Sequence, residues 1–345
     1  MNYIKYYIVF IVLLFFTLDL FAQERNCALK LDEAENLYEM GELDSIPTLL
    51  RSCISDGFEN EELSRAYKLL IRTYLFEDYQ EMAELTMLKF LKKFPEYELK
   101  ANDPIEFTYL YKSYKTVPIF SIGVIGGLNY SYVRIITPYS LDNADDYTGE
   151  YSVSGIGYQV GVQLKRYITD EIEINVDGLF VNKKFDYTIE QLDSKLNYKE
   201  SQLHLSFPIS GTYDFKFKML RPFVRFGFAF DYLMGSTASI ERSFTGDNNR
   251  EALTGSDIDI IDDRNPLNFS LLFGAGVKYD LKKNGYFMFD LRYNLGLTNS
   301  VNGTMRYTND EKIYYYNYVD DDFALSNMYL SVGYVYPFYK TKYKK

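Results

Sequence analysis

The 345-residue chain contains a single histidine, His204, which lies two positions before Ser206. A histidine and a serine form the base and nucleophile of many hydrolases and acyltransferases, so this pair is a candidate for such chemistry. Both residues alternate with Leu203 and Leu205, so they stack along one face of an expected strand, and no third group is identifiable that would orient the imidazole. We therefore expect a buried, hydrogen-bonded histidine, and the sequence predicts no catalytic residue.

Aspartates form three groups outside the regular periodic segments. Clustered carboxylate oxygens can hold calcium, but none of the groups has the spacing of a known calcium loop, so we expect solvated acidic loops. The sequence also lacks zinc-site spacing, a phosphate loop and a dinucleotide fingerprint, and it therefore predicts no metal and no cofactor. The three groups are Asp142, Asp145 and Asp146; Asp257, Asp259, Asp262 and Asp263; and Asp320, Asp321 and Asp322.

The two cysteines, Cys27 and Cys53, are both near the N-terminus. In an exported protein, two cysteines are expected to form one disulfide, which here would tie the start of the N-terminal region to its second helix. Two free buried thiols are the alternative.

Residues 1–22 have the pattern of a secretory signal peptide. Lys5 supplies the positive charge, Ile8–Phe16 the apolar run, and Leu20-Phe21-Ala22 a cleavage site before Gln23. An uncleaved anchor helix is the alternative, although the apolar run is short for a membrane span. No later segment approaches about 20 consecutive apolar residues, so we expect no later transmembrane helix.

Composition narrows the class of protein further. The net charge of -11 argues against a nucleic-acid partner. The chain has 35 Tyr and 26 Phe but no Trp. Tyrosine is amphipathic and suits a lipid–water boundary, so Tyr and Phe are able to build the aromatic girdles of a membrane barrel.

Residues 23–117 are expected to form a small all-α periplasmic domain. Two helix pairs, ended by Gly41, Gly57 and Pro95, approximate the tetratricopeptide pattern of small and large residues. Such pairs stack and leave a concave face for a protein or peptide, and a helical cap without a binding role is the alternative. We expect the docking residues to include Tyr38, Tyr74 and Tyr79.

After Pro118 the hydrophobic period changes from 3.6 to 2, as Val224 to Tyr232 illustrates with alternating aromatic and polar residues. Each of eight strand candidates is long enough to cross a bilayer at a tilt. Short connections alternate with long ones, which is typical of an up-and-down outer-membrane barrel with short periplasmic turns and long extracellular loops. The expected long loops are Ile135–Ser154, Thr188–Asn197, Gly235–Pro266 and Thr298–Ala324. We therefore predict an eight-stranded antiparallel transmembrane barrel over residues 118–345, with the C-terminus in the periplasm.

The alternation also divides polar lumen residues from apolar lipid-facing ones. Eight strands leave an interior just filled by side chains, so we expect paired charges and not a conducting pore, with a gated channel or relay as the alternative. The predicted polar network of the lumen comprises Glu173, Asp177, Arg225, Asp231, Asp290 and Arg292.

The processing site Phe21-Ala22-Gln23, the Tyr-rich strands and the segment Phe120–Asn129 resemble the outer-membrane β-barrel proteins of Bacteroidota bacteria. The resemblance covers residues 119–345, and some barrels of that family belong to type IX secretion and gliding machinery. The N-terminal helical block departs from the bare barrel pattern and implies a docking domain. No catalytic residue carries over from the resemblance.

Together these features predict a non-enzymatic outer-membrane anchor or accessory subunit of an envelope complex for secretion, gliding or uptake. Its expected partners are other outer-membrane or periplasmic proteins and outer-membrane lipid or lipopolysaccharide. A surface-binding or adhesion protein that works through long acidic loops is the alternative. A lipid-modifying enzyme that uses His204 is a third hypothesis.

Overall fold

The computed structural model describes residues 26–139, 149–153, 155–191, 194–215, 220–244, 251–281 and 285–344. The predicted signal peptide lies outside these residues. The chain divides into two compact units, one of Met1–Val117 with Tyr339–Lys345 and one of Pro118–Phe338. The C-terminal tail, predicted as part of the barrel domain, thus belongs to the helical unit.

The helical unit contains five helices in the described part of the chain. The first helix covers residues 26–40 and ends at Gly41, whose φ of +83° suits glycine. The others are α2 (Ile46–Asp56), α3 (Asn60–Phe76), α4 (Gln80–Lys93) and α5 (Ile105–Lys112). No helix among the described residues is long and apolar enough to cross a membrane.

Helix α3 is the centre of this unit because its two faces belong to two different apolar clusters. One face, with Ala66 and Leu70, packs with the first helix and α2, and the other, with Tyr67 and Ile71, packs with α4 and α5. The residues of the C-terminal tail are tied to the same unit. The Lys344 amide donates to the Ser113 carbonyl at 2.8 Å, and the Tyr343 ring centre lies 5.4 Å from that of Tyr114.

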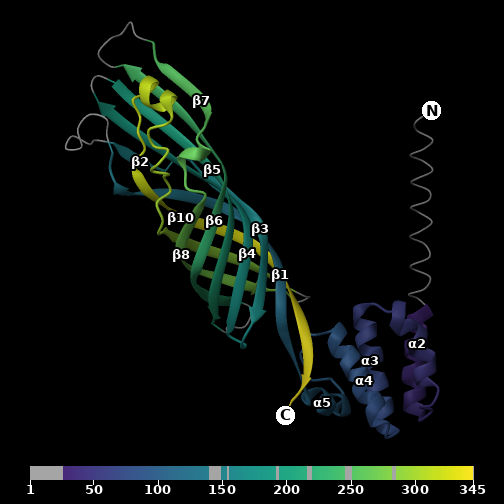
Figure 1. The fold of residues 1–345 in the computed structure, drawn as a ribbon. Coiled ribbons are helices and arrows are strands. Elements are labelled where there is room, and N and C mark those ends of the chain that lie inside the picture. Colours follow the sequence, from purple (N-terminus) through teal and green to yellow (C-terminus); the bar gives the residue numbers. More distant parts are fainter. Residues whose placement is uncertain are drawn as a thin grey trace, which may run out of the picture. The chain divides into compact units, whose positions relative to one another are not determined.

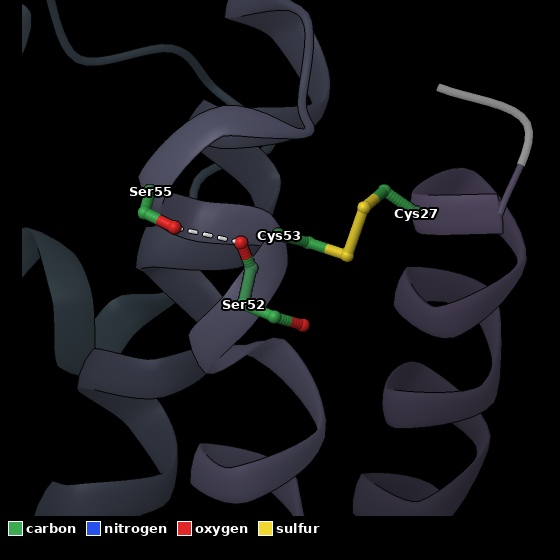
Figure 2. The surroundings of a disulfide bond; sticks show 4 residues. All are labelled: Cys27, Ser52, Cys53 and Ser55. Atoms are coloured by element: carbon green, nitrogen blue, oxygen red, sulfur yellow. Dashed lines mark hydrogen bonds between the residues drawn. A yellow bond between two sulfur atoms is a disulfide. The ribbon is translucent and has the colours of Figure 1, made fainter. Parts of the chain in front are cut away.

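Cys27 and Cys53 form a disulfide between the first helix and α2, with a sequence separation of 26 residues (Figure 2). Both cysteines are buried. Closing a loop of this length restricts the unfolded chain and stabilises the folded state by about 3 kcal/mol.

The double substitution Cys27→Ala, Cys53→Ala is therefore expected to lower the free energy of unfolding of the helical unit by about 3 kcal/mol. Urea unfolding of the full chain in detergent, followed by the helical circular dichroism signal, measures this loss. Reductant should destabilise the wild type similarly and leave the double variant unchanged. An unchanged wild-type midpoint under reductant would contradict the prediction.

In its described residues, the second unit is an antiparallel sheet of ten strands. Their order is β2-β4-β3-β1-β10-β9-β8-β6-β5, β7 pairs with β6, and an additional pairing of β4 with β5 closes the sheet on itself. Figure 1 shows these strands wrapping around a common axis. The strands are β1 (Tyr114–Thr137), β2 (Glu150–Ser152), β3 (Gly157–Tyr167), β4 (Ile172–Gln191), β5 (Ser194–Asp214), β6 (Leu220–Phe244), β7 (Leu253–Asp259), β8 (Leu267–Asp280), β9 (Tyr286–Gly296) and β10 (Asp322–Tyr343).

The structure differs from the prediction of eight strands because pairing continues into segments expected to be loops. The β4–β5 ladder runs as far as Gln191 opposite Ser194, so most of the expected loop Thr188–Asn197 is strand. Strand β6 continues past Gly235 to Phe244, and the short strands β2 and β7 form in two other expected loops. The extensions form backbone hydrogen bonds with their neighbouring strands. Their apolar residues, however, lie on the inner face of the sheet and not on the outer face.

Strand β6 shows this change of face. From Val224 to Met234 the outward positions of β6 carry apolar or aromatic side chains, while Arg225 and Asp231 are buried inside. Beyond Gly235 the order reverses, because Ala238 and Ile240 are buried inside while the outward residues are polar: Thr237, Ser239 and Glu241. β4 and β5 change in the same way. The barrel exterior is therefore apolar along most of its length and becomes polar along these extensions. We call the end of the barrel that they form the long-loop end.

Candidate functional site

Charged side chains meet inside the barrel in three groups. In the first, Lys278 Nζ lies 2.7 Å from Glu173 Oε1 and 2.7 Å from Asp214 Oδ1. Lys165 Nζ reaches Glu173 at 3.3 Å. All four side chains are buried, so each charge is neutralised by a neighbour and not by water.

The second group lies between β4, β6 and β9. Arg292 Nη1 is 2.8 Å from Asp177 Oδ2, and its Nε is 2.5 Å from Asp290 Oδ2. Arg225 Nη1 lies 3.2 Å from the same Asp290 oxygen and 3.6 Å from Asp177. Gln163 Nε2 donates to Asp177 Oδ1 at 2.7 Å. Two guanidinium groups and two carboxylates thus form one compensated buried cluster.

The third group contains Asp231, whose Oδ2 is 2.7 Å from Lys183 Nζ. His204 is buried beside this pair, and its Nε2 lies 2.8 Å from Gln202 Oε1. Lys183, His204 and Asp231 line a cavity of about 10 Å³, which is room for one water molecule and not for a substrate. The six predicted lumen residues are therefore divided among three groups of paired charges.

The long-loop end is filled by residues of the segment 298–324. Val301, Tyr316, Tyr318 and Phe323 from this segment pack in one apolar cluster against the inner face of the strand extensions. The cluster also contains Phe185 and Tyr187 of β4, Leu196 and Tyr198 of β5, and Ala238 and Ile240 of β6. The long chain segment after β9 thus folds back into the barrel end.

A buried ion-pair group fixes this segment. Arg264 donates to both carboxylate oxygens of Glu200, at 2.7 and 2.6 Å, and to Asp320 Oδ1 at 2.8 Å. Lys312 Nζ lies 2.5 Å from Asp320 Oδ2 and 2.8 Å from Asp263 Oδ2. Burial alone would raise the pKa of Asp320, but the charges and hydrogen bonds of Arg264 and Lys312 lower it well below its usual range.

The prediction of solvated loops is wrong for the aspartates at 320–322. Asp320 and Asp321 are fully buried, and Asp321 accepts from the Tyr139 amide at 2.7 Å and from the Tyr151 hydroxyl at 3.0 Å. Asp322 pairs with Arg306. The physical reason is that cationic and hydroxyl partners distant in the sequence replace water. Asp263 is also buried, Asp257, Asp259 and Asp262 are exposed, and Asp142, Asp145 and Asp146 lie outside the described residues.

In the helical unit, the three predicted docking tyrosines differ in exposure. Tyr38 and Tyr74 are half-buried, and the Arg72 guanidinium lies 4.4 Å from the Tyr38 ring centre. Tyr79 is exposed. Sequence reasoning missed the more exposed Phe76, Ile105 and Tyr109, which are 76%, 79% and 80% accessible.

A closed antiparallel sheet that is apolar outside and charged inside is a transmembrane β-barrel, since only such closure satisfies every backbone group in lipid. The chain belongs to the family described as outer membrane protein beta-barrel domain, which matches residues 119–302, and it is an outer-membrane protein. A search of curated proteins gave no match.

Several solved outer-membrane barrels are similar to this chain. Neisserial surface protein A is 16% identical, with 64% of this chain and 97% of that chain covered and a TM-score of 0.30. Ail, the attachment invasion locus protein of Yersinia pestis, is 11% identical over 64% and 100%, with a TM-score of 0.28. The outer membrane enzyme PagL is 14% identical over 64% and 99%, with a TM-score of 0.26.

Proposed function

We propose that this protein is a non-enzymatic outer-membrane anchor whose helical unit docks a protein partner in the periplasm. In this proposal eight of the ten strands cross the membrane, and β2 and β7 remain outside it. The short turns face the periplasm and the long loops face the exterior, with residues 1–22 acting as the signal peptide.

The observation that carries this proposal is the exposure of large apolar side chains on the helical unit. Phe76, Ile105 and Tyr109 are each more than three-quarters accessible, and exposed large apolar and aromatic side chains are the usual anchors of protein–protein contacts. The barrel, by contrast, has its described interior charges paired and its long-loop end filled by its own chain. A filled and charge-compensated interior favours an anchor over a pore.

The packing of the helices supports a tetratricopeptide-like arrangement. Helix α3 packs on one side against the first helix and α2 and on the other against α4 and α5, as a helix in a stacked repeat array does. On this reading the partner is another outer-membrane or periplasmic protein. The resemblance to barrels of Bacteroidota makes components of type IX secretion, gliding or uptake machinery the partners to examine first.

Affinity purification from gently solubilised outer membranes, followed by mass spectrometry, tests the proposal. The variant Phe76→Ser, Tyr109→Ser should lose partners that the wild type retains, because both side chains are exposed and their removal leaves the fold intact. A matched control is Leu29→Ser, Met40→Ser, which removes two exposed apolar side chains from the first helix of the same unit. Equal partner sets for both variants and the wild type would refute docking through Phe76 and Tyr109.

A further inference from the structure

Three tyrosines protrude from the segment 298–324 at the long-loop end. Tyr307, Tyr314 and Tyr315 are 59%, 79% and 64% accessible, although the same segment buries Tyr316 and Tyr318. Tyr314 and Tyr315 end a single π-helical turn, Glu311–Tyr315. We call the described residues 251–266 and 298–324 the loop surface.

The buried neighbours of these tyrosines hold the rings outward. Lys312, two residues before Tyr314, is buried and paired with Asp263 and Asp320, and Tyr316, one residue after Tyr315, lies in the apolar cluster. The Asn317 amide also donates to the Ile313 carbonyl at 3.1 Å. A turn fixed on both sides presents its exposed rings in one arrangement, so binding through them costs little conformational entropy.

The charges of the loop surface are separated by sign. Its three described cationic side chains, Arg264, Arg306 and Lys312, are all buried and paired with carboxylates. The exposed charged side chains of the same described residues are all acidic: Glu251, Asp257, Asp259, Asp262, Asp310 and Glu311. The exposed face therefore combines aromatic rings with negative charge.

We propose that the loop surface binds a lysine- or arginine-rich segment of a partner protein. Cationic side chains are attracted to the faces of tyrosine rings, and Asp310 and Glu311 lie in the same turn to pair with them. The same charge repels lipid phosphates and nucleic acid. This interaction is separate from the docking proposed for the helical unit, because it uses only residues of the barrel unit.

Fluorescence anisotropy with a labelled peptide of alternating Lys, Arg, Gly and Ser, titrated with the full chain in detergent at 0.15 M salt, tests the proposal. We expect Tyr314→Ser, Tyr315→Ser to weaken peptide binding about tenfold, since each exposed cation–π contact contributes several-fold. Asp310→Asn, Glu311→Gln should also weaken binding and reduce its salt dependence.

A matched control, Glu61→Gln, Glu81→Gln, removes the same charge from exposed positions of the helical unit and should leave binding unchanged. If this control weakens binding as much as the loop variants do, the peptide is attracted only by the overall charge and the proposal fails. The proposal also fails if the tyrosine variant binds the peptide like the wild type. In the same assay with labelled neutral dextran in place of the peptide, it fails if the tyrosine variant weakens binding of dextran and not of the peptide.

Discussion

Replacing Arg292 with methionine is expected to lower the free energy of unfolding of the barrel by about 3–5 kcal/mol. The guanidinium of Arg292 joins Asp177 and Asp290, and all three side chains are buried. After its removal, two carboxylates share Arg225 alone, and the buried negative charge that remains has no water to stabilise it. Methionine keeps the unbranched apolar part of the arginine side chain, so the measured loss comes mainly from the missing guanidinium group.

Urea unfolding of the protein folded in lipid vesicles, followed by circular dichroism and by the gel mobility of the folded form, measures this loss. Arg166→Met provides the matched control, because Arg166 is an exposed residue at the end of β3 and its replacement should cost less than about 0.5 kcal/mol. Adding Asp290→Asn to Arg292→Met should recover part of the stability by removing one unpaired charge. Equal stability of Arg292→Met and wild type would show that this cluster is not a stabilising unit.

Arg264→Met is expected to release the segment 298–324 from the long-loop end, with a local cost of about 3–5 kcal/mol. Arg264 is the cation shared by Glu200 and Asp320, so its loss leaves buried carboxylates from β5 and from the folded-back segment without that shared partner. The strands that carry the apolar exterior do not depend on this contact. The barrel should therefore persist while its end opens.

Hydrogen–deuterium exchange measured by mass spectrometry distinguishes these outcomes. Residues 298–324 should exchange about a hundredfold faster or more in Arg264→Met, while β8 and β9 keep their protection. Arg242→Met, at a half-exposed position of β6, should change neither region. Uniform loss of protection along the barrel would contradict a local role for Arg264.

The pH dependence of this segment follows from Asp320. Although burial alone would raise it, the charges of Arg264 and Lys312 lower the folded-state pKa of this carboxyl. The ionised form therefore stabilises the folded segment fully above the unfolded-state pKa of about 4, and this stabilisation is lost as the pH falls through the lower folded-state pKa. The wild-type segment should therefore remain protected at pH 5.

The barrel interior was the most predictable part of this molecule, because a strand has a period of two and Asp177, Arg225 and Arg292 each lie between apolar residues. Continuing the period of two for six residues beyond Asp177 along β4 would also have placed Lys183 on the inner face. The periodicity rule did not predict that the lumen charges form three groups, because this grouping depends on which strands pair and in which register. Periodicity within one strand contains no such information.

The long-loop end was not predictable from local patterns. Arg264 meets Glu200 across 64 residues and Asp320 across 56, and nothing near any of the three indicates the others. Ser45 occupies the N-cap position of α2, but its hydroxyl donates to the Glu42 carbonyl at 3.4 Å and does not cap the helix. The helix begins without that hydrogen bond, because Pro47 in its first turn and tertiary packing favour the helical conformation.

The position along β6 at which the outward side chains change from apolar to polar indicates the thickness of the membrane that the barrel fits. The outward apolar run from Val224 to Met234 contains ten residue steps, each about 3.3 Å long, and a tilt of about 40° reduces their span to about 25 Å along the membrane normal. That height equals the apolar band of outer-membrane barrels. A thicker bilayer would bury Thr237 and Glu241 in hydrocarbon, so hydrophobic mismatch would disfavour such membranes and help to sort this chain to a thin one.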